Sequence, residues 1–537
     1  MHIFPSEITE RLPERFTDPF RYAPHPLVKE AAGFVIREIE SRPDLHEAFM
    51  EGKMLGVLIV SDNDGQLGYL AGFSGNVGGV SHINGFVPPI YDLLEPSGHF
   101  KLREAEITAV NHDIDALLGS PLLKELTDSL SCFEKSRDEE IGLMKTRMGL
   151  SKKQREEARK GTDDPALLSA LVRESQFEKA ELKRLKACWE EKIALIRKEI
   201  AEVQEQIRGL KSKRAAMSDE LQKWIFSQYI VHNQNGEEKS IGDIFADLGL
   251  TPPGGTGECA APKLLEHAYR NGLKPLAMGE FWYGESPSTA VRTHGHFYPS
   301  CTSKCGPLLG FMLKGLELEK ASQATAEPDI IYEDPYLIAI DKPSGMPSVP
   351  GLDGRISAYE FLSRDYQDLH VIHRLDMDTS GILLFAKTAE TAVDMQRQFE
   401  EHTIRKTYHA KLSASEAGEA LKAGDKGEIS LPLSPDYDER PRQKVDHAQG
   451  KAALTTYEVM SVSEDGTVEI IFHPHTGRTH QLRVHAAHTL GLGRPIVGDM
   501  LYGGSPASRL LLHACSITFH HPATPSQLFT ITCKSDI

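Results

Sequence analysis

One aspartate, in a run of polar and turn-forming residues, is the strongest candidate for chemistry in this 537-residue chain. The run His373-Arg374-Leu375-Asp376-Met377-Asp378-Thr379-Ser380-Gly381 leads directly into the apolar stretch Ile382 to Ala386. A short β-prone run after a turn predicts a buried strand, so Asp376 is expected on the loop that precedes it. A rigid scaffold can hold a reactive side chain on such a loop. Alone, the run is equally consistent with an Arg-Asp pair in an ordinary turn.

Two later motifs offer partners for this aspartate. Tyr408 lies in the run Arg405 to Ala410, and Arg483 in the run Gly477 to His485. A nearby guanidinium keeps a carboxylate ionised, and such a carboxylate can act as nucleophile or general base. Tyr408 offers a flat face for stacking and a phenol for proton transfer. These side chains, without a phosphate-binding loop or a Ser-His-Asp order, favour chemistry on a heterocyclic base.

In order and approximate spacing, these motifs resemble those of the RluA family of pseudouridine synthases. The run Asp341 to Pro347 also resembles the start of that family's catalytic domain, and the resemblance covers about residues 328 to 537. It implies that Asp376 is the catalytic aspartate, Tyr408 the active-site tyrosine and Arg483 the basic partner of the aspartate.

The resemblance implies an isomerase that converts uridine in RNA to pseudouridine without a cofactor. The N1–C1′ bond breaks, the uracil rotates, and C5 bonds to C1′. Asp376 would either attack C1′ or remove the 2′ proton to form a glycal, and the sequence leaves both routes open. The target base must first leave the helical stack.

Three further segments resemble an insertion in the founding branch of the family: Leu431 to Leu433, Arg440 to Asp446 and Gly450 to Ala452. That branch acts on a tRNA anticodon stem-loop and on a similar hairpin of large-subunit rRNA. The alternatives are the same chemistry on another rRNA site, or an RNA-binding or folding factor with dispensable activity. The residues predicted to bind RNA are Arg374, Arg440, Arg442, Lys444, Arg478 and His480.

The composition is that of a globular protein, with 40% hydrophobic residues, 26% charged residues and a net charge of −17. RNA must therefore be recognised by local basic clusters and not by a global positive field. No apolar run approaches the ~20 residues that span a bilayer, and no signal peptide is visible. Seven scattered cysteines give no disulfide framework, so we predict a cytoplasmic protein with no membrane association.

We predict an α+β protein of four parts: a mixed segment (1–101), an antiparallel helical hairpin or coiled coil (102–229), a linker domain of unknown role (230–327) and the catalytic domain (328–537). For the last part, the resemblance implies a mixed, mainly antiparallel sheet with flanking helices. The run Ala321 to Ala326 is the expected linker before it.

The helical prediction depends on apolar residues that repeat every 3.5 positions in the second of two predicted helices. The turn Gly161 to Pro165 separates the two helices. A homodimer through the second helix is the alternative to a hairpin within the chain. The apolar positions of that repeat are Leu182, Trp189, Ile193, Ile196, Ile200, Val203, Ile207, Leu210, Met217, Leu221 and Trp224.

A group of cysteines and histidines precedes the catalytic domain and mixes ligand types that suit zinc. Its members are Cys259, His294, His296, Cys301 and Cys305. The spacing matches no regular zinc finger, and the aromatic residues nearby favour ordinary packing. We therefore predict no metal, and a metal assay on the purified protein tests this.

Overall fold

The computed structural model describes residues 1–4, 10–95, 97–319, 326–351, 355–414, 421–437 and 439–537. The chain divides into two compact units, one of Met1–Asp92 with Phe226–Ile537 and one of Leu93–Ile225. The expected linker at 321–326 lies, apart from its last residue, outside the described residues. Among the described helices, none has a stretch long and apolar enough to cross a membrane.

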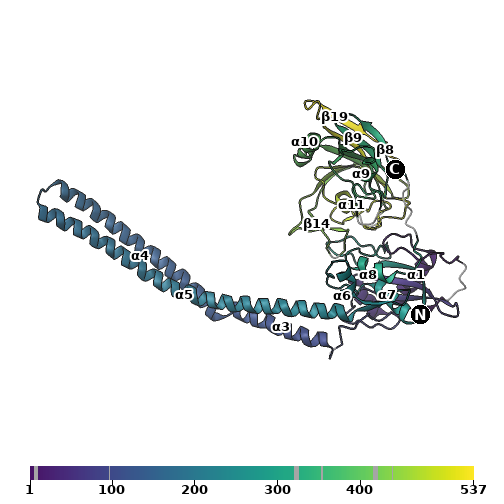
Figure 1. The fold of residues 1–537 in the computed structure, drawn as a ribbon, viewed down its shortest axis with the longest axis horizontal. Helices are drawn as coiled ribbons and strands as arrows, with labels where there is room; N and C mark the ends of the chain where they lie inside the picture. Colours follow the sequence, from purple (N-terminus) through teal and green to yellow (C-terminus); the bar gives the residue numbers. More distant parts are fainter. Residues whose placement is uncertain (5–9, 96, 320–325, 352–354, 415–420, 438) are drawn as a thin grey trace. The chain divides into compact units, whose positions relative to one another are not determined.

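The helical unit is built from three long helices, of which α4 and α5 lie side by side and run antiparallel (Figure 1). Arg155 of α4 pairs with Glu178 of α5 at 2.7 Å, and Glu134 of α4 pairs with Arg197 of α5 at 2.6 Å. The residue number therefore rises along one helix as it falls along the other. The helices are α3 (His99–Leu118), α4 (Pro121–Lys160) and α5 (Pro165–Gln228).

Apolar side chains of these helices contact one another. Val110 and Ile114 of α3 pack against Ile207 of α5 in one small buried cluster. Further along, Phe133 and Trp189 meet edge to face with ring centroids 5.9 Å apart. The contacts within the chain therefore come from α3 and α4 on one side and α5 on the other, while dimerisation through α5 stays a prediction.

The first unit contains a five-stranded sheet with the order β1-β3-β2-β6-β7. Its strands come from the chain segments before and after the helical unit in the sequence, because β6 pairs with β2 along nearly its whole length. The segments predicted as separate domains, 1–101 and 230–327, therefore share one sheet. Alternation of apolar residues predicts a strand but not which distant strand it pairs with. The strands are β1 (His2–Ile3), β2 (Lys53–Ser61), β3 (Leu67–Phe73), β6 (Lys274–Tyr283) and β7 (Phe297–Tyr298).

Short helices and a small two-stranded sheet surround this five-stranded sheet. Helix α1 packs its buried face into the same core as β2 and β6. The elements are α1 (Pro26–Glu40), α2 (Pro43–Met50), β4 (Ile230–His232), β5 (Glu238–Ser240), α6 (Ile241–Asp247), α7 (Ala260–Arg270) and α8 (Cys305–Met312).

Residues 329–532 of the same unit form a ten-stranded sheet, called the C-terminal sheet below. Its main path is β13-β16-β17-β12-β18-β11-β9-β8, with β10 beside β11 and β19 beside β18. All pairs are antiparallel except β11 with β18, so the predicted α+β fold with a mixed, mainly antiparallel sheet is confirmed.

The bounds of the elements in this part are β8 (Asp329–Glu333), β9 (Leu337–Lys342), α9 (Ala358–Leu362), β10 (His370–Val371), β11 (Ser380–Ala386), α10 (Ala389–Glu400), β12 (Arg405–Leu412), β13 (Lys426–Ser430), β14 (Leu433–Pro435), β15 (Gln443–Val445), β16 (Leu454–Val462), β17 (Val468–Pro474), α11 (Gln481–Ala487), β18 (Leu512–His520) and β19 (Leu528–Thr532).

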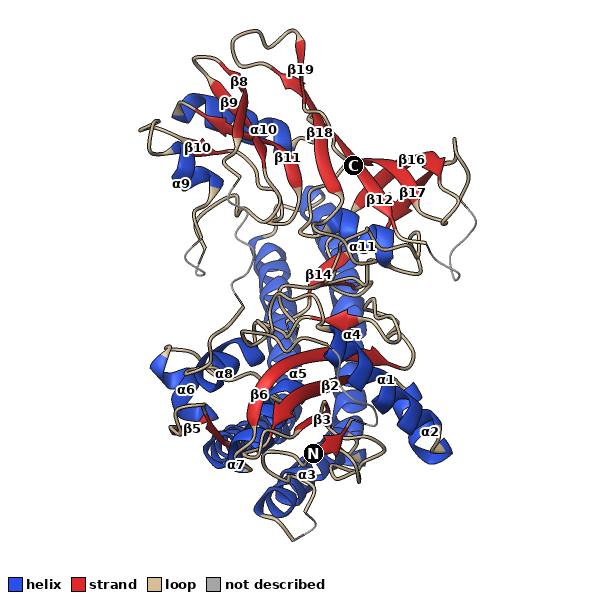
Figure 2. Cartoon of the chain, turned by 90° about the vertical axis from the view of Figure 1, so that its right-hand side faces the viewer, coloured by secondary structure: helices blue, strands red, loops and turns tan. Residues whose placement is uncertain are grey.

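Helices cover both faces of the C-terminal sheet. Successive residues of β11 point to opposite faces, and Leu384 packs into the core under α10 while Leu383 packs into the core under α9. Helix α11 packs on the half of the sheet that contains β12, β16 and β17. Figure 2 shows β11 and β18 between the two halves of this sheet.

The two halves meet where β11 lies parallel to β18, and Gly381 is required there. Its φ is +107°, and a Cβ at this position would lie 2.4 Å from the carbonyl oxygen of Ala514. Ala514 pairs with Gly381 on one side and with Tyr408 of β12 on the other. Tyr408 is therefore two strands, about 10 Å, from the end of the loop that carries Asp376.

Candidate active site

The loop that carries Asp376 is fixed by a second loop, residues 342–348, which follows β9. Ser348 donates from its hydroxyl to the carbonyl of Leu375 at 2.8 Å and accepts the Leu375 N–H at 3.1 Å. Ser344 donates to the carbonyl of Asp378 at 2.6 Å. The backbone is therefore held on both sides of Asp376.

Lys342 also holds these two loops together. Its side chain is fully buried, and its Nζ donates to the carbonyls of Pro343, Met346 and Met377 at 3.0, 2.8 and 2.9 Å. Burial lowers the pKa of Lys342 to about 7, while the charges of Asp378 and Asp376 act in the opposite direction. Sequence reasoning did not single out this lysine, because its three acceptors lie on two loops that only the fold brings together.

His373 is a structural residue. Its Nε2 accepts the backbone N–H of Leu384 at 3.1 Å, and its ring stacks on Phe399 at 5.0 Å. Burial, with a smaller contribution from Lys406, lowers the pKa of His373 to about 3. The imidazole is therefore neutral, as its role as an acceptor requires.

Asp376 is partly buried on its loop, and its surroundings both raise and lower its pKa. Burial raises the pKa of Asp376, and Asp499 adds to this rise. The positive charges of Arg483 and Lys342, and a hydrogen bond from the backbone N–H of His480, act to lower it. A partly desolvated carboxylate with nearby positive charge suits a nucleophile or a general base.

Arg483 lies on the short helix α11. Its Nε and one terminal nitrogen donate to the two carboxylate oxygens of Asp499, each at 2.7 Å. Both side chains are buried. Burial alone would lower the pKa of Arg483, but Asp499 and Asp376 raise it, so the guanidinium is charged. The flanking residues Leu482 and Val484 are also buried.

Asp499 is a second site residue that sequence reasoning missed. It is 1% exposed, and one of its oxygens also accepts the N–H groups of Leu501 and Tyr502 at 3.0 and 3.1 Å. Burial raises the pKa of Asp499, but Arg483 outweighs this and lowers it. In the sequence it is a single carboxylate sixteen residues after Arg483, with no motif that connects the two.

Tyr408 packs against the hydrophobic cores on both halves of the C-terminal sheet. Burial raises the pKa of Tyr408, and the charge of Asp376 raises it further. The phenol is therefore protonated at neutral pH. This state suits stacking and hydrogen-bond donation better than it suits removal of a proton.

Tyr502 connects two of the predicted RNA-binding residues to the site. Its hydroxyl lies 2.9 Å from Nδ1 of His480, and its ring lies 4.9 Å from the Arg442 guanidinium and 5.3 Å from that of Arg483. Arg442 is 4% exposed and donates to the carbonyls of Val291 and Leu501. Arg442 and His480 thus have internal partners, and their contact with RNA stays a prediction.

Comparison with known proteins identifies the family. A family model described as RNA pseudouridylate synthase matches residues 336–488. The dual-specificity RNA pseudouridine synthase RluA of Escherichia coli K12 is 41% identical over 200 residues, which cover 36% of this chain and 87% of that protein. The Vibrio cholerae protein of the same name is 42% identical over 200 residues, or 36% and 78%. The chain belongs to the RluA family of RNA pseudouridine synthases.

Membership in the RluA family confirms the predicted enzyme class, an isomerase that acts on RNA. A solved structure with similarity to the chain is human RNA Pseudouridylate Synthase Domain Containing 1, at 25% identity and a TM-score of 0.33, covering 40% of this chain and 86% of that one.

Three of the predicted RNA-binding residues of this RluA-family chain are exposed. They are Arg374 beside Asp376, Arg440, and Arg478 in the loop before α11. Arg478 donates from Nε to the carbonyl of Ala452 at 3.1 Å. Lys444 is half-buried on β15. These exposed guanidinium groups are able to contact phosphate.

Proposed function

We propose that this chain isomerises one uridine in a tRNA anticodon stem-loop and one in a similar hairpin of large-subunit rRNA. The identity to a synthase named for dual specificity, over 87% of that relative, supports a shared target class. The insertion-like segments at 431–433, 440–446 and 450–452 support the same branch. The proposal places the protein in the cytoplasm with these RNAs.

The single observation that carries the mechanism is the electrostatic grouping of Asp376, Arg483 and Tyr408. Asp376 acts as an ionised carboxylate, either on C1′ or on the 2′ proton. Arg483, fixed by its two bonds to Asp499, keeps positive charge beside that carboxylate throughout the reaction. Tyr408 stacks on the uracil as it rotates.

The target uridine leaves the helical stack, which costs a few kcal/mol, and contacts in the pocket offset this cost. Arg374, exposed two residues before Asp376, occupies the vacated space or binds a phosphate. Since the net charge is −17, binding depends on a few local contacts. The salt dependence of RNA affinity should therefore correspond to a small number of released counterions.

Pseudouridine mapping of tRNA and large-subunit rRNA tests the target. The RNAs come from a strain that lacks the gene and is complemented with wild type, Asp376→Ala or an empty vector. Wild type should restore one mark in an anticodon stem-loop and one in an rRNA hairpin, and Asp376→Ala should restore neither. A wild-type mark on another rRNA site alone would move the target, and rescue by Asp376→Ala would remove the catalytic role of Asp376.

A further inference from the structure

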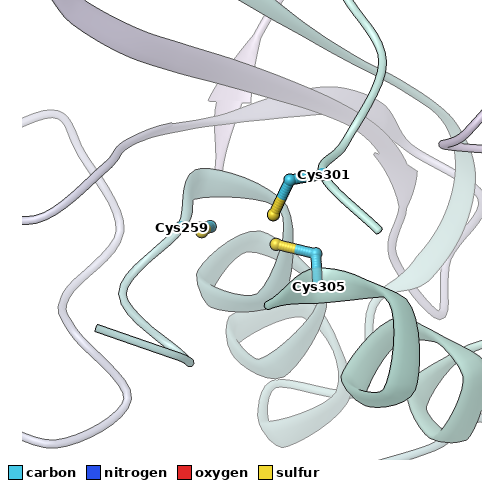
Figure 3. Close-up of side chains that lie close together, drawn as sticks. All are labelled: Cys259, Cys301 and Cys305. Atoms are coloured by element: carbon cyan, nitrogen blue, oxygen red, sulfur yellow. The ribbon is translucent and has the colours of Figure 1, made fainter. Parts of the chain in front are cut away.

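Three cysteines that lie far from the proposed active-site residues in the sequence converge in the N-terminal part of the first unit (Figure 3). Cys259 immediately precedes α7, Cys301 lies in the loop after β7, and Cys305 is the first residue of α8. Their sulfur atoms lie within 4.8 Å of one another. Cys305 is buried, and the other two are partly buried.

The separation of the sulfurs suits one tetrahedral ion. Zinc binds thiolate at about 2.3 Å, so two sulfurs on a tetrahedral zinc ion lie about 3.8 Å apart. Because the sulfurs lie within 4.8 Å of one another, side-chain movements of about an ångström or less bring them to that separation. An iron–sulfur cubane binds each cysteine to a different iron atom and therefore needs sulfurs that lie farther apart. A disulfide would join only two of the three and leave the third beside it.

The protein around the sulfurs is built to stabilise negative charge. The backbone N–H groups of Lys304 and Cys305 donate to the Cys301 sulfur. Cys259 is the residue before the first turn of the eleven-residue helix α7, where the helix dipole favours thiolate. Lys263 is buried one turn into that helix and interacts electrostatically with Cys259.

The two histidines of the same sequence pattern do not belong to this group of close ligand atoms. His294 accepts the Gly284 N–H at 3.1 Å through Nδ1, and the His296 ring packs against Tyr298 at 4.8 Å. The three cysteines are among the residues that line a cavity of about 370 Å³. Among the described residues, the ligand group therefore consists of these three cysteines, with room in the cavity for a water molecule.

We propose that Cys259, Cys301 and Cys305 bind one zinc ion as thiolates, with a water molecule from the cavity as the fourth ligand. Binding releases the thiol protons to solvent and leaves three thiolates with Zn²⁺. The net charge is then −1, and the N–H groups and Lys263 stabilise it. The ion connects the start of α7 to the start of α8. This proposal replaces the expectation from sequence that the chain binds no metal.

Zinc content of the full-length chain, purified under reducing conditions without a metal-affinity tag, tests this site. Elemental analysis should give about one zinc per chain for wild type, and Cys259→Ser and Cys305→Ser should lose most of it. The matched control is the double variant Cys132→Ser with Cys188→Ser, at two exposed positions on the helical arm, which should keep its zinc. Cys533→Ser, from a second group with Asp341 and His513, should also keep it.

Wild type without zinc, both before and after added Zn²⁺, would overturn the proposal. So would zinc that is lost only in Cys533→Ser, or bound iron with inorganic sulfide. Because a serine variant could fail to fold, wild type is also stripped with chelator and loaded with Co²⁺. Thiolate-to-cobalt charge-transfer bands and the visible bands of tetrahedral Co²⁺ are expected. Alkylation with peptide mapping should label Cys259, Cys301 and Cys305 only after chelation, and labelling before chelation would contradict the site.

Discussion

At the scale of single residues, the proposed chemistry depends on how Asp376 keeps a charge in a partly desolvated place. Burial raises its pKa, while Arg483 and Lys342 act in the opposite direction. Arg483 does this from a fixed position because its guanidinium group hydrogen-bonds to Asp499 and not to Asp376. The basic partner implied by the sequence therefore acts on the aspartate through space, and a second, buried aspartate positions it.

The pH dependence of single-turnover rates follows from this balance. The reaction needs ionised Asp376, so the rate should fall as pH falls through its pKa, which lies above the ordinary 3.8. Arg483→Gln removes the larger favourable charge, so the acid limb should move to higher pH. Arg483→Lys, which keeps the charge, should move it less. An acid limb in Arg483→Gln at or below that of wild type would contradict this account.

Sequence reasoning at this scale singled out Asp376, Tyr408 and Arg483, because each lies in a motif of its own, and their catalytic roles stay predictions. It could not identify Asp499 or Lys342, because their partners are a side chain sixteen residues away and carbonyls of two separate loops. Motifs predict which residues react. The partner of a buried charge is decided by packing that one sequence does not display.

At the scale of elements, the 342–348 loop and the Asp376 loop form one interlocked pair. Lys342→Met should leave three carbonyls without their donor and loosen the loop that carries Asp376. Because each unsatisfied buried group costs about 1–3 kcal/mol, the free energy of unfolding should fall by about 3 kcal/mol or more. A displaced nucleophile should lower kcat by about 10²-fold, with little change in KM for RNA.

Lys387→Met is the matched control, because Lys387 is part of a surface ion pair with Glu333. Urea denaturation should show a change of about 1 kcal/mol or less for this variant. Equal effects of the two variants on stability and kcat would show that the carbonyl contacts of Lys342 do not position the loop.

The elements themselves were predicted unevenly. The strand after Asp376 was expected from an apolar run that follows a turn. Helix α11, which carries Arg483, is seven residues long, and so short a pattern of apolar and polar residues does not distinguish a helix from a strand. The pairing of β2 with β6 could not be read from sequence, because more than 200 residues separate the two strands.

At the scale of the whole molecule, the helical unit Leu93–Ile225 is compact by itself and distinct from the unit that carries the candidate active site. A variant that lacks residues 93–225, joined by a short Gly-Ser linker, should keep kcat/KM on a minimal stem-loop within about twofold. On full-length RNA it should lose about tenfold if the arm supplies a second contact. If the ratio of variant to wild-type kcat/KM is the same on both substrates, these helices do not supply a second RNA contact. A change from dimer to monomer in sedimentation would assign the arm to dimerisation.

The central claim is that Asp376 carries out the chemistry, and the most direct measurement is the release of tritium from uracil C5 in a labelled stem-loop. Formation of the C5–C1′ bond must expel that atom. Asp376→Asn keeps the shape of the side chain and should bind the stem-loop with an unchanged Kd, while the release rate falls by at least about 10²-fold. Release within about tenfold of wild type, at equal RNA binding, would contradict the account.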